Sequence, residues 1–383
     1  MGHSRIALRQ RDGPPLYSRH HADAAPRRAT PGRARPLHRR RVCPSPGVLL
    51  KRAALAARRP ALAATLGLAD VWIQDETSRF GLPAFKSVGV EFAVARLRER
   101  GGLDGVTTLV CASAGNHGRA VARAARAAGR SARIYLDRDV ATPRLEAIAS
   151  EGADIVRVDG TYDDAVRLAA DDAARTGALV ISDTSWDGYT EIPRDIMLGY
   201  SQVMDDAAAA WGDDGPPDVL LVQAGVGGLL AAVASWSAFT WGDERPRLIG
   251  VEPRLAACVQ ASSRAGAPTA VDGPLTTIMA GLRCGEVSPI AFSIVDGLVD
   301  AYVAVDDDWC RAAMRRLARP DGDDSALAVG TSGSAGIAAL LALHAEATPA
   351  DRQALGLTAG ARAFVIATEG VTEPALWRDV TGG

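Results

Sequence analysis

Residues 107–118 read TTLVCASAGNHG, and the pattern of their side chains indicates the class of architecture. The run from 107 to 111 is β-branched or apolar, which is typical of a buried strand. Small residues follow as a loop, and a helix is predicted from 116 to 128, where Gly129 ends it. A buried strand, a glycine loop and a helix in this order form the repeating unit of a parallel sheet.

The same order recurs from about residue 50 onward. Strands are predicted at 71–74, 107–111, 132–136, 154–158, 179–182, 219–223, 247–251 and 363–367. Helices are predicted at 84–100, 116–128, 142–151, 161–176, 193–211, 227–240, 306–319 and 334–346. About eight or nine strands are too many for one compact sheet, so we expect an α/β fold of two lobes. Each lobe is expected to be a mostly parallel sheet flanked by helices.

The sequence also predicts how the chain divides between these lobes. Residues 1–45 are rich in Arg, Pro, Ala and His, lack apolar periodicity and are expected to be disordered. Residues 46–88 and 200–383 are expected to form the larger domain, and 89–199 a smaller α/β domain. Ligands of such folds lie beyond the carboxyl ends of the strands, so the loops there are the candidate sites.

Charge and cysteine content narrow the function classes. The first 50 residues hold 11 arginines against Asp12 and Asp23, yet the whole chain carries −2, so its main body is acidic. Nucleic-acid binders place positive charge on the folded domain, which argues against a nucleic-acid partner. No apolar run approaches the roughly 20 residues of a membrane span. The five cysteines are scattered, so we expect no disulfide framework, no metal site and a cytoplasmic protein.

Lysine is rare in this chain: of 43 basic residues only Lys51 and Lys86 are lysines. A desolvated lysine amine forms an imine with a carbonyl group, which arginine does not. Lys86 lies in the segment 76–89, ETSRFGLPAFKSVG, near the start of a predicted helix. The positive end of the helix dipole is expected to lower the pKa of this amine. Taken alone, a surface lysine kept by chance is the commoner interpretation.

The loop from Ser113 to Gly118 opens the helix after the strand at 107–111. Its exposed amides suit a carboxylate or phosphate, so Ser113, Ala114 and Gly115 are candidate substrate-binding residues. Asn116 offers a donor and an acceptor to an aromatic ring hydroxyl. His117 is interpreted as a structural residue that caps the turn.

A second glycine loop, 223–228, reads QAGVGG and forms an anion nest suited to a phosphate. A dinucleotide fingerprint competes with this interpretation, because Glu252 follows at about the distance of a ribose-binding acid. The third small residue of that fingerprint falls on Leu230, which does not match. Taken alone, the loop leaves both interpretations open.

Asp183 follows the predicted strand at 179–182, in the segment SDTSWDGY of residues 182–189. An acid at a strand end is a candidate general base or acid. An aspartate that only caps the turn is as frequent, so the residue pattern alone leaves both roles open.

Together these segments resemble the tryptophan-synthase-β-like pyridoxal-phosphate (PLP) enzymes of fold type II, and among them the diaminopropionate ammonia-lyases. The resemblance covers about residues 60–375. It is carried, in order, by SRFGL at 78–82, AFK at 84–86, GNHGR at 115–119, YDDAV at 162–166, DTSWDGYTEIP at 183–193, QAGVG at 223–227, VEP at 251–253, TIMAGL at 277–282, CGE at 284–286 and TEG at 368–370. The segments at 183–186 and 277–281 separate this lyase from a threonine dehydratase.

The resemblance implies PLP as the cofactor, bound as a Schiff base to Lys86, with Asn116 at its ring hydroxyl. Thr368 is implied to lie near the pyridine nitrogen, and Asp183 matches the acid that takes a proton from the L-isomer. The loop implied to hold the phosphate consists of Gly225, Val226, Gly227 and Gly228. The implied reaction is α,β-elimination from 2,3-diaminopropionate, which gives pyruvate and two ammonia molecules.

Two positions depart from the family pattern. The family carries an acid associated with the D-isomer at the position of Ala114, so we expect weak or no activity on D-diaminopropionate. It carries Glu at the position of Thr331, and a neutral side chain there changes the charge near the cofactor. Because of these two departures, the substrate of this protein does not follow from the resemblance alone.

Several alternatives therefore remain beside an L-diaminopropionate lyase. One is a serine or threonine dehydratase-like lyase, favoured by Ser113 and Ala114, and another is a β-replacement synthase. A third is a PLP-binding protein without turnover, and a fourth is a nicotinamide-dependent dehydrogenase. The resemblance also implies a homodimer that acts on a small amino acid.

Overall fold

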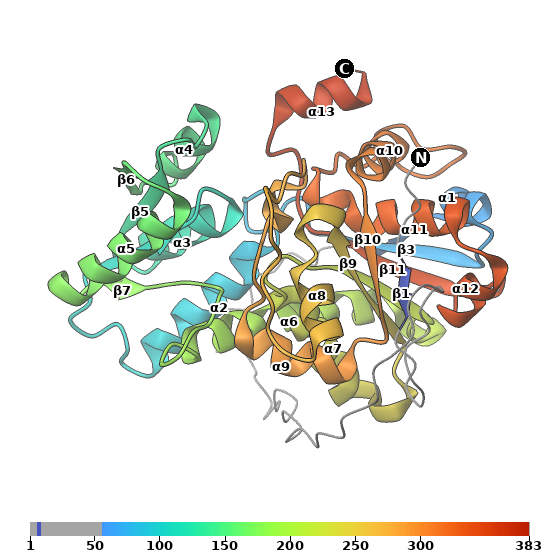
Figure 1. Ribbon diagram of the computed structural model, residues 1–383, viewed down its shortest axis with the longest axis horizontal. Helices are drawn as coiled ribbons and strands as arrows, with labels where there is room; N and C mark the ends of the chain where they lie inside the picture. The colour runs from blue at the N-terminus through green and yellow to red at the C-terminus, as the bar shows by residue number, and fades with distance from the viewer. Residues whose placement is uncertain (1–5, 9–55, 383) are drawn as a thin grey trace.

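The computed structural model describes residues 6–8 and 56–382, which form two lobes, each built on a sheet (Figure 1). The larger sheet has the strand order β1-β10-β9-β8-β11-β3-β2 and the smaller one β6-β5-β4-β7. The strands are β1 Ile6–Leu8, β2 Ala56–Arg58, β3 Asp70–Asp75, β4 Thr108–Ala112, β5 Ser131–Asp137, β6 Asp154–Val158, β7 Leu179–Val180, β8 Val219–Gln223, β9 Arg247–Pro253, β10 Ala301–Val305 and β11 Arg362–Ala367.

Helices cover both sheets, and within the described residues none combines the length and apolar character needed to cross a bilayer. They are α1 Pro60–Leu66, α2 Lys86–Glu99, α3 Asn116–Ala127, α4 Thr142–Ala149, α5 Tyr162–Thr176, α6 Glu191–Trp211, α7 Gly228–Trp241, α8 Cys258–Ala265, α9 Pro289–Leu298, α10 Asp307–Ala318, α11 Ala335–Glu346, α12 Pro349–Ala354 and α13 Pro374–Thr381. Helices α3, α4 and α5 lie with the smaller sheet at the left of Figure 1.

The predicted fold class is confirmed by the pairing of the strands. All pairs are parallel except those of the edge strands β1 and β2, which run antiparallel to their neighbours. Every residue of β8 is buried, as expected for a central strand with helices on both faces. The carboxyl ends of the parallel strands therefore gather the loops that carry the predicted site.

Three details of the sequence-based prediction need correction. Residues 6–8, within the segment expected to be disordered, form β1 against β10. Strand β10 itself was missed, although its residues 301–305, AYVAV, are all buried. The strand predicted at 179–182 ends at Val180, because the amide of Ser182 instead donates to the hydroxyl of Tyr189. The domain limits at 88/89 and 199/200 stay predictions, and all strands of the smaller sheet fall between them.

Helix α2 crosses helix α6 at a contact between glycines. A Cβ added to Gly89 would lie 2.4 Å from Cε1 of Tyr200 and 2.7 Å from the carbonyl oxygen of Ile196. A Cβ added to Gly199 would lie 2.8 Å from the Cα of Gly89. Because no real Cβ fits at such distances, the close crossing of the two helices depends on both glycines. The crossing fixes the start of α2, where Lys86 lies.

Replacing Gly89 with alanine is expected to destabilise the protein by about 1–3 kcal/mol, because the added methyl group overpacks the helix crossing. Chemical denaturation of wild type and variant measures this change in the free energy of unfolding. The matched control is Gly297→Ala in α9, where a Cβ meets nothing within 4 Å. That control is expected to be neutral or stabilising, by up to about 1 kcal/mol. Equal destabilisation by both substitutions would contradict the packing argument.

Candidate active site

A cavity of about 300 Å³ is lined by residues that follow strands of both sheets. All residues that the sequence predicts for the site line it: Lys86, Ser113, Ala114, Gly115, Asn116, Asp183, Gly225, Val226, Gly227, Gly228 and Thr368. Positions that are far apart in the sequence thus lie around one cavity, as expected for the carboxyl ends of parallel strands.

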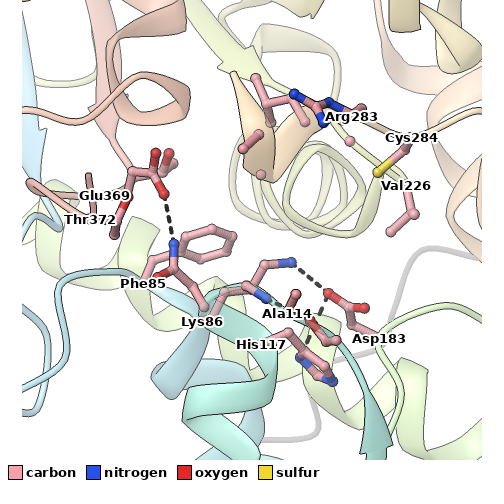
Figure 2. Close-up of a pocket in the computed structure, with 18 of the residues that line it drawn as sticks. Phe85, Lys86, Ala114, His117, Asp183, Val226, Arg283, Cys284, Glu369 and Thr372 are labelled. Atoms are coloured by element: carbon pink, nitrogen blue, oxygen red, sulfur yellow. Dashed lines mark hydrogen bonds and ion pairs between the residues drawn. The ribbon is translucent and has the colours of Figure 1, made fainter. Parts of the chain in front are cut away.

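Lys86 is the first residue of α2, and its Nζ lies 2.5 Å from Oδ2 of Asp183 (Figure 2). The rings of Phe85 and Tyr200 lie 5.3 and 5.7 Å from Nζ and form an aromatic wall. Lys86 is the only lysine among the described residues. The cavity therefore contains one primary amine, held in place by a carboxylate and two rings.

The expected lowering of the pKa of Lys86 is wrong. Burial does lower the pKa of this amine, but the charge and hydrogen bond of Asp183 outweigh burial, so the pKa is raised above its ordinary value. The helix dipole that motivated the prediction acts over one turn, whereas the carboxylate lies in direct contact. Asp183 thus holds the amine as an ammonium.

Asp183 lies three residues beyond the end of β7, between Lys86 and His117. Burial raises the pKa of this carboxyl, but the neighbouring His117 and Lys86 outweigh burial, so its pKa lies below its usual range. Nε2 of His117 lies 3.0 Å from the carbonyl oxygen of Ile181, and burial lowers the pKa of the imidazole. A neutral His117 donates from Nε2 to Ile181, consistent with its predicted structural role. Asp183 is therefore an ionised acid in the cavity.

The second glycine loop connects β8 to α7 and forms a narrow cradle. Gly227 has φ of +93°, a left-handed conformation that favours glycine, and it directly precedes the 14-residue helix α7. A Cβ on Gly225 would lie 3.0 Å from Sγ of Cys284 and 3.2 Å from the carbonyl oxygen of Gly281. The loop thus brings bare backbone and a positive helix end to the cavity, which suits a phosphate.

The competing dinucleotide interpretation is not supported by the position of Glu252. Its carboxylate accepts hydrogen bonds from the amides of Val259 and Gln260, both 2.8 Å long, at the start of α8. Glu252 is 1% exposed and is not among the residues that line the cavity. An acid already bound to a helix start and enclosed in protein is not available to a ribose.

Two pocket residues directly follow β11. Thr368 accepts a hydrogen bond of 2.9 Å from Nε2 of Gln223, which fixes its hydroxyl. Glu369 accepts a hydrogen bond of 2.7 Å from Nδ2 of Asn116 (Figure 2). Glu369 was present in the TEG segment of the sequence but received no role there. The sequence gives one sign of a functional position for Glu369, which is that it lies directly after a buried strand. It gives no sign of the contact with Asn116, which is 253 residues away.

The cavity fits PLP in three independent respects. It offers a single amine for the aldehyde, a bare glycine cradle for the phosphate, and an aromatic wall beside the amine. A volume of about 300 Å³ lies at the lower end of the range for small-molecule sites. Asn116 and Thr368 also line the cavity, and their side chains can donate and accept hydrogen bonds to the polar atoms of the PLP ring.

Comparisons with known proteins agree with this geometry. The family model described as "Pyridoxal-phosphate dependent enzyme" matches residues 55–359. The chain is 35% identical to diaminopropionate ammonia-lyase of Escherichia coli (strain K12), over 83% of this chain and 84% of the relative. The structure of selenomethionine-containing holo diaminopropionate ammonia-lyase from Escherichia coli superposes with a TM-score of 0.81 and 32% identity, covering 87% of this chain and 88% of that one.

The same Escherichia coli enzyme has been solved in complex with an aminoacrylate–PLP azomethine reaction intermediate. That structure superposes with a TM-score of 0.80 and 34% identity, covering 87% of this chain and 88% of that one. The sequence match, the shared fold and the cavity around Lys86 agree, and the chain belongs to the diaminopropionate ammonia-lyase family of PLP-dependent enzymes.

Proposed function

We propose that this protein catalyses the PLP-dependent α,β-elimination of L-2,3-diaminopropionate to pyruvate and ammonia. The observation that carries the proposal is the pair of Lys86 and Asp183, 2.5 Å apart in one cavity with the glycine cradle. Relatives that share 35% of the sequence carry the name of this activity. The site and the family therefore support the same chemistry.

PLP, when bound, supplies an aldehyde for an amine and an electron sink for the charge that develops at Cα. Lys86 would hold it covalently, and the amides of the loop that ends at Gly228 would hold its phosphate. Asn116 and Thr368 would contact the polar atoms of its ring. Phe85, 8% exposed, would help to exclude water from the reacting centre.

The chain's own residues then position the substrate and move its protons. The amides of residues 113–115, before the start of α3, would bind the α-carboxylate. Asp183, an ionised acid, would take the Cα proton of the L-isomer. The Cβ–N bond would then break, and the β-amino group, protonated as an ammonium, would leave as ammonia with the bonding electrons. The enamine that is released reacts with water to give pyruvate and a second ammonia.

An assay of pyruvate and ammonia tests the proposal on purified, PLP-loaded protein. L- and D-diaminopropionate, L-serine and L-threonine are each supplied as the substrate. We expect L-diaminopropionate to give the highest kcat/KM and two ammonia molecules per pyruvate. Dominant release of product from serine or threonine would instead support a dehydratase-like lyase, in which a hydroxyl group leaves.

The remaining alternatives give different results in the same experiment. A visible cofactor band without turnover would support a PLP-binding protein, or a synthase that lacks its second substrate. Adding small thiols and amines as nucleophiles separates these two, because only a synthase forms a replacement product. Failure to bind PLP would overturn the proposal.

The D-isomer is expected to be a poor substrate of this protein. Ala114 lines the cavity, and its methyl group accepts no proton, whereas the resemblance implies an acid for the D-isomer at this position. Because a missing general base typically costs about 10²–10⁴-fold in rate, kcat/KM for D-diaminopropionate should be lower than for the L-isomer by at least about 10²-fold. Turnover of both isomers at similar rates would contradict this expectation.

Introducing an acid at position 114 tests the same argument in the other direction. Ala114→Asp is expected to raise kcat/KM for the D-isomer, while Ala114→Asn, of the same size and polarity but without a base, is not. Both variants are assayed with both isomers, so that a general loss of activity is separated from a change of stereochemical preference. Equal effects of Asp and Asn would assign the change to size alone.

A homodimer in the cytoplasm is the form that the family resemblance supports. Light scattering coupled to size-exclusion chromatography of the PLP-loaded protein measures the mass of the assembly. A mass of twice the 39.9 kDa chain is expected, and a monomer would overturn the expectation. A small amino acid is the expected partner of the site, in agreement with the size and polarity of the cavity.

A further inference from the structure

Glu369 is a buried acid in the cavity that takes no part in the proton transfers described above. Its side chain is 5% exposed, and Oε1 accepts a hydrogen bond of 3.0 Å from the amide of Ser332. Oε2 accepts a hydrogen bond of 2.7 Å from Nδ2 of Asn116. Within the described residues it forms no ion pair with an arginine, lysine or histidine. Burial raises the pKa of this carboxyl, and the two neutral donors oppose that effect without reversing it.

These contacts determine which way the amide of Asn116 faces. Because Oε2 of Glu369 accepts a hydrogen bond from Nδ2, the Nδ2 side of the amide faces Glu369 and its oxygen faces away. The second hydrogen on Nδ2 then has no further protein acceptor among the described residues and is available to a ligand in the cavity. Gly118 lets the first turn of α3 lie close to the preceding loop, because a Cβ there would lie 2.2 Å from the carbonyl oxygen of Ser113.

We infer that Glu369 is a positioning residue, which orients the Asn116 amide so that its second Nδ2 hydrogen is offered to the ring hydroxyl oxygen of PLP. The contact also links the two lobes, since Asn116 begins α3 beside the smaller sheet and Glu369 follows β11 of the larger one. The inference rests on the cofactor part of the proposed function, and it is independent of which amino acid is the substrate.

Glu369→Gln is the informative substitution, because it preserves shape while changing which atoms accept hydrogen bonds. Glutamine has one accepting oxygen, and both Ser332 and Asn116 present a donor to the acid. If the glutamine oxygen accepts from Ser332, its amide nitrogen faces Asn116 and requires an acceptor there. The Asn116 amide must then turn, which presents its oxygen rather than a hydrogen to the cofactor.

The visible absorption of the PLP-loaded protein, recorded without substrate, reports this change. We expect Glu369→Gln to shift the cofactor band and to weaken PLP binding about tenfold, because the hydrogen bond that orients the Asn116 amide is lost. Asn116→Ala should produce a similar shift. The double variant should show no further change, because Glu369 acts through Asn116. The matched control is Glu373→Gln, which removes an equal charge from an acid paired with Arg144 and should leave the band in place.

Additive effects of Glu369→Gln and Asn116→Ala on the band would overturn the inference. So would a Glu369→Gln protein with the band and the PLP affinity of wild type. Circular dichroism and thermal unfolding of each variant exclude loss of folding as the cause, and Asn116→Ala addresses the same contact from the other lobe. If diaminopropionate is not turned over while the band responds as expected, the proposed substrate fails and the role of Glu369 stands.

Discussion

Replacing Lys86 with alanine is expected to abolish turnover of L-diaminopropionate, with a loss of about 10³–10⁶-fold in kcat. Lys86 is the only lysine among the described residues, so no neighbouring amine in that part of the chain replaces it. The visible band of a covalently bound cofactor should disappear at the same time. Steady-state pyruvate release and the absorption spectrum of the purified variant measure the two effects.

Lys86→Arg is the matched control for this experiment. The alanine variant leaves the buried Asp183 carboxylate without its cation, which is destabilising by itself. Arginine keeps a positive charge beside Asp183 but forms no imine. A folded, inactive Lys86→Arg protein without the band therefore assigns the loss to covalent chemistry. Retention of activity within tenfold of wild type in either variant would contradict the assignment of Lys86.

Asp183→Asn is expected to lower kcat for L-diaminopropionate by about 10²–10⁴-fold while PLP remains bound. Asparagine keeps an oxygen that accepts a hydrogen bond from Lys86 but does not take a proton from Cα. If proton transfer becomes slower, the primary kinetic isotope effect with substrate deuterated at Cα should increase. An unchanged isotope effect together with a normal rate would show that another group removes the proton.

The same variant changes the titration of Lys86 in a defined direction. The Asp183 carboxylate opposes the effect of burial and raises the pKa of the Lys86 amine, so its removal should lower that pKa. Uptake of PLP requires a neutral amine, and it should therefore extend to lower pH in Asp183→Asn than in wild type. The pH dependence of the rate at which the band forms in the apoprotein measures this. A shift to higher pH would contradict the argument.

The repeating architecture was accessible from sequence because it depends on local patterns. Buried strands such as β8 are almost entirely apolar. Glycines commonly follow the last turn of a helix and so mark where it ends. Strands β1 and β2 have three residues each, too few for a period, and they exist only through pairing with β10 and β3. Strand β10 is a short, continuous apolar run, and such a run does not by itself separate a strand from a buried helix.

The candidate site was predictable as a set of residues but not as a set of contacts. Glycine loops and strand ends identify which residues face a cavity, since parallel strands bring their carboxyl ends together. The direction of the Lys86 pKa depends on Asp183, which is 97 residues away in the sequence. The role inferred for Glu369 depends on a hydrogen bond across the lobes. No local pattern encodes either contact, because packing of the two sheets creates them.

The near absence of lysine gives this protein an uncommon selectivity towards covalent reagents. Its other basic side chains in the described residues are guanidinium groups or imidazoles, which acylating agents modify far less readily than an amine. Reagents such as activated esters therefore meet one side-chain amine in that part of the chain. Because Asp183 holds this amine as an ammonium, the labelling requires alkaline pH, at which a neutral fraction forms. Occupancy of the site can consequently be read as protection of a single residue in a peptide mass map.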